Sequence, residues 1–138
     1  MGAQRQEAPS FTIEERETHI VVRQHAIVAS RLAADDMLAA LSNALEQRNL
    51  AKAVLDQRGL PEIDDTLRDA LWEWARGAGR RIALAIILDS EVARMQSNMT
   101  ALSSGFQLRA FGAEPLAEAW LFATPAQRPT AELPPIKD

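Results

Sequence analysis

The fold of this chain is decided by residues 81–88, whose sequence is RIALAIIL. From position 82 to position 88 no polar residue interrupts the run. Stretches with apolar residues at helical spacing flank it on both sides. A short, continuous apolar run in this setting is typical of a strand that helices cover on both faces of a sheet. The sequence therefore predicts a central strand here, within an α/β fold.

The chain before this run is predicted to supply the first strands and two helices. Residues 11–13 and 19–23 carry β-forming side chains on either side of a charged stretch, which indicates an opening hairpin. Residues 26–28 are predicted to continue the hairpin or add a strand, and residues 51–56 to form a short buried strand. One helix has apolar residues three and four apart, namely Met37, Leu38, Leu41 and Leu45. The next begins at Asp64 and has the stripe Leu67, Ala70, Leu71 and Trp74.

The chain after the run is predicted to add two helices and one strand. Asp89 or Ser90 is predicted to cap a helix. The apolar stripe of this helix is predicted to consist of Val92, Met95, Met99 and Leu102. Residues 106–111 alternate apolar and polar side chains, as a strand does. Pro115 suits the first turn of a last helix, whose stripe consists of Leu116, Ala119 and Trp120.

Together these elements predict a single α/β domain. Its sheet is mixed, with the opening hairpin followed by alternating strands and helices, and about four helices pack on it. We expect right-handed crossovers between the parallel strands. The domain is predicted to cover residues 11–123, between a flexible polar N-terminus, 1–10, and a flexible proline-rich tail, 124–138.

Length and composition exclude several classes of protein. The 138 residues are 47% hydrophobic and 25% charged, values of a globular domain. A net charge of −4 argues against a nucleic-acid partner, which requires a basic face. The chain has no cysteine and two histidines, so we expect no disulfide, no metal site and no cofactor. No stretch is long enough to span a membrane, and no targeting segment is visible, so we expect a cytoplasmic protein.

The first candidate for chemistry is an acidic set around the loop after the strand 51–56. It consists of Asp56, Glu62, Asp64 and Asp65. Ligand sites in open α/β sheets lie at such carboxyl ends of strands, and carboxylates could hold a hard cation there. The other interpretation is that Asp64 caps the helix and Asp65 favours its positive end.

The sequence gives less support to a catalytic site than to a binding site. His19 and His25 flank a strand and would share one face if it is unbroken, but a base needs a positioned partner. A hydrolase using Asp56 and a histidine stays open as an alternative. Gly77 and Gly79 follow a helix, whereas phosphate loops precede one, so these glycines are predicted to end the helix. We expect no enzyme activity.

Two further groups could contact a partner. Trp72 lies near the edge of an apolar stripe, where it is either a partner anchor or half-buried packing. Arg76, Arg80 and Arg81 gather at a helix end, where cations offset the helix dipole or meet an anionic partner.

A family resemblance enters at residues 56–67, whose sequence is DQRGLPEIDDTL. It resembles the signature of STAS domains, the family named after sulfate transporters and anti-sigma-factor antagonists. Asp56 and Gly59 match the strand-ending Asp and the Gly three residues later. Ile63 and Asp64 match the apolar residue and the second Asp of that signature. Thr66 falls on the serine that a partner kinase phosphorylates in the antagonists.

The chain departs from the signature at two positions, where Asp65 replaces a serine and Leu67 replaces a glycine. Over residues 11–122 the order of elements looks like the bacterial STAS-like branch that resembles CRAL-TRIO lipid-binding domains. The resemblance implies a STAS-like mixed sheet and a non-catalytic, regulatory role.

The resemblance leaves two kinds of ligand open. In the first, a regulatory protein partner docks on Asp56, Gly59, Asp64, Asp65, Thr66 and Trp72, and Thr66 is a possible phosphoacceptor. In the second, an apolar small molecule or lipid lies between helices and sheet, where Met37, Met95 and Met99 could adapt to it. Pairing of edge strands could also make a homodimer.

Overall fold

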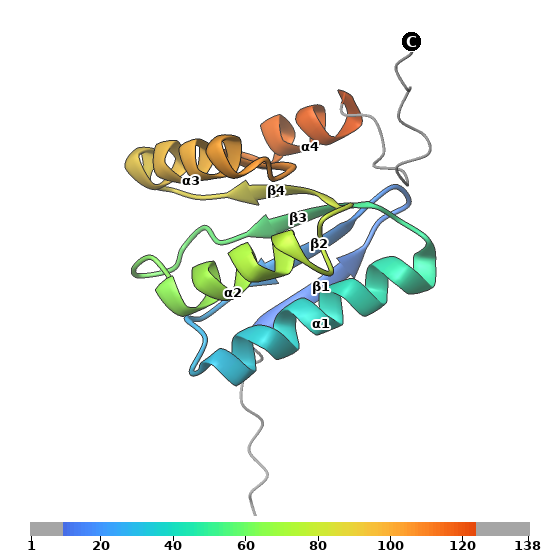
Figure 1. Cartoon of the computed structure of the whole chain (residues 1–138), viewed down its shortest axis with the longest axis horizontal. Coiled ribbons are helices and arrows are strands. Elements are labelled where there is room, and N and C mark those ends of the chain that lie inside the picture. The colour runs from blue at the N-terminus through green and yellow to red at the C-terminus, as the bar shows by residue number, and fades with distance from the viewer. Residues whose placement is uncertain (1–9, 124–138) are drawn as a thin grey trace, which may run out of the picture.

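The computed structural model describes residues 10–123 and shows a five-stranded sheet with four helices (Figure 1). The α/β class and the mixed sheet are therefore confirmed. The predicted tail, 124–138, and all but the last residue of the N-terminal segment 1–10 lie outside the described residues. The elements in chain order are β1 (Phe11–Glu15), β2 (Ile20–Gln24), α1 (Arg31–Arg48), β3 (Lys52–Asp56), α2 (Asp65–Arg76), β4 (Ala83–Ile87), α3 (Glu91–Ser104), β5 (Leu108–Phe111) and α4 (Glu114–Ala123).

The strands lie in the sheet in their order along the chain, from β1 to β5. β1 and β2 form the predicted antiparallel hairpin, and every later pair is parallel. All five residues of β4 are buried, as its continuous apolar run predicts. β1 and β5 form the two edges. Because parallel neighbours run the same way, β3 and β4 both end at the same edge of the sheet, where Asp56 pairs in register with Ile87.

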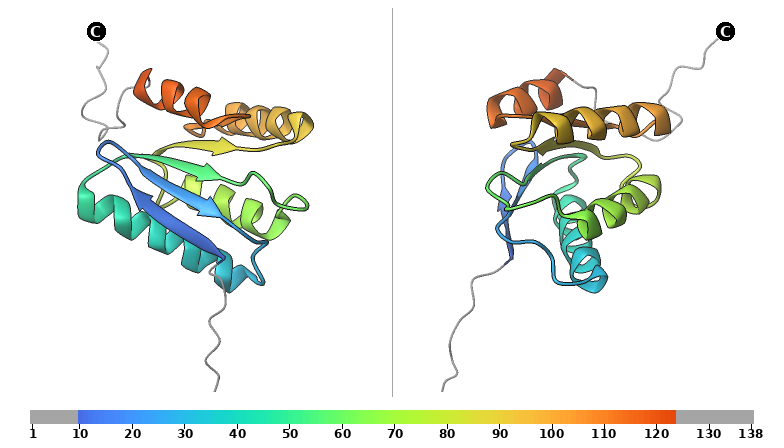
Figure 2. Two further views of the ribbon diagram at one scale, coloured as in Figure 1. Left: turned by 180° about the vertical axis from the view of Figure 1, so that it is seen from behind. Right: turned by 90° about the vertical axis from the view of Figure 1, so that its left-hand side faces the viewer.

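The helices cover both faces of the sheet (Figure 2). One face packs against α1 and α2, and the small core on the other face packs against α4. Alternation along the strands separates the two sets. Ile20, Val22, Leu55, Leu84 and Ile86 point to the first face, whereas Val21, Val54, Ala85 and Ile87 point to the second. Among residues 10–123, no helix combines the length and apolar character needed to cross a membrane.

The prediction of a strand at residues 26–28 was wrong. β2 ends at Gln24, and the chain then runs as an irregular loop to α1. The backbone N–H of Val28 donates to a carboxylate oxygen of Asp64 at 2.8 Å, so it is not available to a sheet. The Val28 side chain is buried in the main core, which explains why it is apolar.

The predicted apolar stripe of α3 was also wrong. Its four residues are exposed, with exposed fractions of 54–75% for Val92, Met95, Met99 and Leu102. The buried positions are Ala93 and Ala101. The reason lies in Asn98, whose side chain accepts a hydrogen bond from Ala110 N (2.7 Å) and donates one to Ala110 O (3.3 Å). Asn98 thereby binds α3 to the free edge of β5, and small residues allow the close approach.

In α4 the predicted stripe is displaced by one position. Leu116 and Ala119 are exposed, whereas Ala117 and Leu121 are completely buried against the sheet. Trp120 is half-buried and packs at an angle on Phe111, with ring centroids 5.9 Å apart. The sequence predicted the position of this helix along the chain correctly, but it predicted the wrong side of the helix to face the sheet.

Candidate binding site

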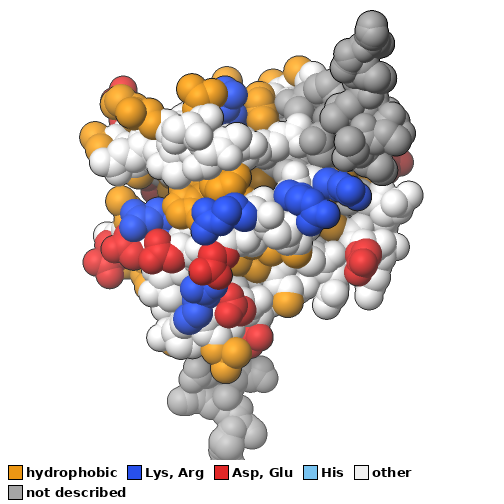
Figure 3. Space-filling model, viewed as in Figure 1, with side chains coloured by type: hydrophobic (Ala, Val, Ile, Leu, Met, Phe, Trp, Pro, Cys, Tyr) orange, Lys and Arg blue, Asp and Glu red, His pale blue; other side chains and the backbone are white. Residues whose placement is uncertain are grey.

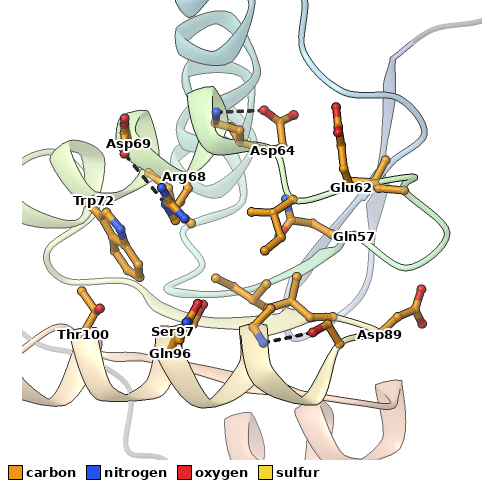
Figure 4. A pocket seen from close by; sticks show the side chains of 18 of the residues that line it. Gln57, Glu62, Asp64, Arg68, Asp69, Trp72, Asp89, Gln96, Ser97 and Thr100 are labelled. Atoms are coloured by element: carbon orange, nitrogen blue, oxygen red, sulfur yellow. Dashed lines mark hydrogen bonds and ion pairs between the residues drawn. The ribbon is translucent and has the colours of Figure 1, made fainter.

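An open cavity of about 680 Å³ lies between α2 and α3, and we name it the α2–α3 groove. Its lining comes from four segments: the loop 57–64, α2, the end of β4 with the residues after it, and α3. Figure 4 shows side chains from these segments turned toward a common space. In Figure 3 hydrophobic side chains show in the hollow beside α3, Lys and Arg side chains border it, and acidic side chains gather beyond them. The volume falls within the range of small-molecule sites, about 300–1,000 Å³.

Apolar side chains form the floor of the groove. Leu67 and Leu71 of α2 and Ile86 of β4 are buried there. Ile63 and Met99 also line the groove but are about half exposed, at 48% and 64%. Half-exposed apolar residues above a buried apolar floor favour an apolar guest, because its entry removes their surface from water.

Trp72 lines the groove from α2 at its third turn. The ring is half-buried and stacks on Phe106, with centroids 5.5 Å apart and planes at 18°. Trp72 therefore lies at the margin of the core, as its place at the edge of the apolar stripe predicts. Trp74, two residues later, is buried in the main core as predicted, and its indole N–H donates to Ser42 Oγ at 2.8 Å.

Asp64 lines the groove but is itself only 3% exposed. One of its carboxylate oxygens accepts hydrogen bonds from the side chain of Gln24 (2.7 Å) and from Val28 N (2.8 Å). The other accepts from Leu67 N at 3.1 Å, which caps α2. The prediction that Asp64 starts this helix is confirmed. Asp64 also joins α2 to the loop after β2, a contact that the sequence does not reveal.

Asp56 lies on the far side of the sheet end, in a network of arginines and carboxylates. Its carboxylate accepts from Arg23 Nη1 at 2.7 Å and from Arg58 Nη2 at 2.7 Å. Arg23 also pairs with Glu14 at 2.7 Å and Glu114 at 3.3 Å. Burial alone would raise the pKa of Asp56, but the hydrogen bonds from Arg58 and Arg23 outweigh it and lower that pKa. Hydrogen bonds from Arg23 and Arg16 lower the pKa of Glu14 to about 2.

The other predicted site residues are Gly59, Asp65 and Thr66. They are exposed, and they lie next along the chain to residues that line the groove. Gly59 has a φ of 87°, which suits glycine, and its N–H donates to Asp89 Oδ2 at 2.8 Å. Asp65 is exposed and pairs with Arg68 at 3.2 Å, one helical turn away. Thr66 is exposed in the first turn of α2. Of the six residues predicted for partner docking, Asp64 and Trp72 line the groove, and Glu62 of the predicted acidic set lines it as well. Asp56 belongs to the arginine–carboxylate network.

The contribution of α3 to the groove was missed by sequence analysis. Ala93, Ser97 and Met99 line it. Of these only Met99 was considered as a ligand contact, and the other two candidate methionines are elsewhere, Met37 in the core and Met95 exposed. Small residues such as Ala93 and Ser97 carry no signal of a binding site, since small residues occur equally where helices merely pack.

The two histidines are not brought together. His25 is exposed and its ring shares a hydrogen bond of 3.0 Å with Thr12 Oγ1. His19 is buried just before β2, and its Nε2 lies 3.7 Å from a carboxylate oxygen of Glu118. The register places His19 at the opposite end of the sheet from Asp56. Within residues 10–123, no three acidic or histidine side chains converge as a metal site.

Acid should weaken the fold in two stages. Burial lowers the pKa of His19 below its ordinary 6.5, more than the Glu118 carboxylate raises it. The folded state then binds this proton less readily than the unfolded chain, so stability present above pH 6.5 falls as the pH drops below it. The lowered pKa values of Glu14 and Asp56 add a second loss, which for Glu14 extends from about pH 4.5 down to about 2.

Urea unfolding at pH 7, 5.5 and 4 measures both stages. We expect His19→Phe to abolish the difference in unfolding free energy between pH 7 and pH 5.5. The further loss of stability between pH 5.5 and pH 4 should remain. An unfolding free energy that rises from pH 7 to 5.5 in the wild type would contradict the assigned direction for His19.

No protein-family model and no curated protein sequence matches this chain. Its fold is similar to that of an uncharacterised protein of the DUF3478 family, with a SpoIIAA-like fold, from Shewanella loihica PV-4. The TM-score is 0.62 at 15% sequence identity, and the match covers 86% of this chain and 99% of the other. The SpoIIAA-like fold is the STAS-like fold. The predicted architecture is therefore confirmed, and at this identity the similarity concerns the fold alone.

Proposed function

We propose that this chain is a non-catalytic binding module of the STAS type, whose ligand is a small, mainly apolar molecule or acyl chain. The observation that carries the proposal is the α2–α3 groove, which joins a suitable volume to a buried apolar floor. The sequence also resembles the STAS-like branch that is similar to CRAL-TRIO lipid-binding domains, and this resemblance supports an apolar ligand. The proposal keeps the cytoplasmic location expected from the sequence, and the homodimer as an open possibility at the edge strands.

Binding rather than catalysis is favoured by what the best acid and base candidates already do. Both oxygens of Asp64 accept hydrogen bonds that hold the fold together. The Asp56 carboxylate is shared between two guanidinium groups. Although burial alone would raise it, hydrogen bonds from Arg58 and Arg23 lower the pKa of Asp56, so this carboxylate resists protonation and is a poor general base.

Filling the groove should abolish ligand binding and leave the fold intact. Ser97 lines the groove and is half-buried, so Ser97→Phe places a ring in the space for a ligand. We expect native mass spectrometry of the gently purified wild type to show a bound mass of a few hundred daltons, and this mass to be absent from the variant. The matched control is Ser103→Phe, on the same helix but exposed and outside the groove. An apo mass for the wild type argues against an apolar ligand.

Docking of a regulatory protein is the second candidate. It is favoured by the exposed loop and helix start, where Ile63 is 48% exposed beside the acidic Glu62 and Asp65. A phosphate on Thr66 would add negative charge there, and could switch such docking off. A partner captured by the wild type and by Ser97→Phe, but lost with Thr66→Glu, would favour docking over the groove ligand.

A further inference from the structure

We infer that the ligand of the α2–α3 groove carries a cationic group, such as an alkylammonium, on its apolar body. The inference rests on the proposed function, because it names the ligand class of that same groove. It follows from the charged residues that line the groove within residues 10–123, which are Glu62, Asp64, Asp69, Asp89 and one cation, Arg68. Four carboxylates against one guanidinium leave an acidic groove around an apolar floor.

The acidic groups at one end of the groove are available to a ligand. Glu62 is exposed, and within residues 10–123 no side chain or backbone donor reaches its carboxylate. Asp89 is also exposed, and only its Oδ2 is engaged, by Gly59 N at 2.8 Å. Figure 4 shows Glu62 and Asp89 toward the same end of the groove, from the loop before α2 and from the end of β4. A cationic head at this end of the groove would gain from the negative charge of both.

Arg68, the one cation that lines the groove within the described residues, is already paired with carboxylates. Arg68 lies 3.2 Å from an oxygen of Asp65 and 3.9 Å from one of Asp69. An anionic head would have to compete with these two carboxylates for Arg68 and would meet the remaining acids as like charges. Like charges brought together at a partly buried site are unfavourable. The charge pattern therefore disfavours a fatty-acid carboxylate or a lipid phosphate.

The same pattern sets the direction of the ligand. Trp72 and Thr100 lie at the opposite end of the groove from Glu62 and Asp89 (Figure 4). We expect the ammonium group at the end of the groove that carries Glu62 and Asp89, and the alkyl chain along Leu67 and Leu71 toward Trp72. Apolar contact then supplies most of the affinity, and the acids select the head group.

Three probes of equal chain length test this inference, namely octylammonium, 1-octanol and octanoate, each below its micelle concentration. Isothermal titration and the intrinsic tryptophan fluorescence, to which Trp72 in the groove contributes beside Trp74 and Trp120, report binding to the full chain. We expect octylammonium to bind about tenfold more tightly than octanol, because the exposed acids attract the ammonium group, and octanoate to bind most weakly, because they repel the carboxylate. Raising the salt concentration should reduce the preference for the amine.

The matched variant is Glu62→Gln with Asp89→Asn, which removes two charges and keeps an acceptor for Gly59 N. It should bind the amine and the alcohol about equally. The control is Glu17→Gln with Asp36→Asn, which removes two exposed charges outside the groove and should keep the wild-type preference. Equal binding of all three probes to the wild type, or tightest binding of octanoate, overturns the inference and leaves the groove ligand in place. No binding of any probe, together with an apo native mass, overturns the proposed function as well.

Discussion

Replacing Asp64 by alanine should destabilise the protein by about 3–4 kcal/mol. The change removes the cap of α2, which alone is worth about 1 kcal/mol. It also leaves Val28 N–H without its acceptor in a buried site, and it removes one of the two acceptors of the Gln24 amide, which still donates to Ala26 O. Each such loss costs about 1–3 kcal/mol. Chemical denaturation measures the loss, and the melting temperature should fall by about 10–15 °C.

The neighbouring acid provides a control for this result. Asp65→Ala removes an exposed carboxylate whose one ion pair, with Arg68, spans 3.2 Å, so it should change the free energy of unfolding by less than about 0.5 kcal/mol. Asp64→Asn should fall between the two, because an amide oxygen can replace only one of the two accepting oxygens. Equal stability of the Asp64→Ala and Asp65→Ala variants would contradict the role given to Asp64.

The burial of Asp64 also decides how partner docking can be tested. A lysine at this position would place a cation where three donors converge, and the fold would fail before any docking surface was changed. Substitutions at the exposed Asp65 and Thr66 alter the same end of α2 without that effect. Loss of binding in those variants can then be assigned to the surface.

The second large effect concerns Gly79, in the turn that follows α2. A Cβ atom at this position would lie 2.4 Å from the Trp74 ring, well inside van der Waals contact. Gly79→Ala must therefore displace a buried indole and weaken its hydrogen bond to Ser42. We expect a loss of about 2–3 kcal/mol, as for other overpacked cores, seen as a lower denaturation midpoint and a shifted Trp fluorescence spectrum.

Two comparisons separate this clash from a general effect on the turn. At Gly77 a Cβ would meet only a backbone oxygen at 3.6 Å, an ordinary contact, so Gly77→Ala should be nearly neutral. In a Trp74→Ala background the ring is gone, and Gly79→Ala should then cost little, which a double-mutant cycle reports as strong coupling. Additive effects of the two substitutions would show that the ring contact is not the cause.

Several features could be predicted from sequence because they depend on local pattern. The run 81–88 indicates a strand buried on both faces, and β4 is that strand. Ser90 and Asp64 stand where helix N-termini need an acceptor, and both cap a helix. The glycines after α2 end it, as expected. In each case the signal and the structure lie within a few residues of each other.

The rotation of α3 could not be predicted in this way. The apolar residues at helical spacing predicted the wrong side of α3 to be buried. Helical periodicity depends on hydrophobicity alone and cannot show a polar contact to a distant strand. The hydrogen bonds from Asn98 to the backbone of Ala110 turn the helix, and they exist only once β5 lies beside it. Small residues such as Ala93 and Ala101 are then the buried positions of the helix, and the larger apolar residues stay outside.

The sequence by itself determined the order of strands and helices, the mixed sheet and the position of the loop 56–67. Only the tertiary structure decided what the acids of that loop do. Asp56 and Asp64 are separated by eight positions, yet one joins arginines on the α4 side while the other holds the loop after β2 to α2. Apart from Arg58, these groups lie 33 to 58 positions away along the chain. Arg23 is 33 positions from Asp56, Val28 is 36 positions from Asp64, and Glu114, which shares Arg23 and Arg58 with Asp56, is 58 positions from it. Pairing over such distances depends on how the strands are ordered, which local propensity does not encode.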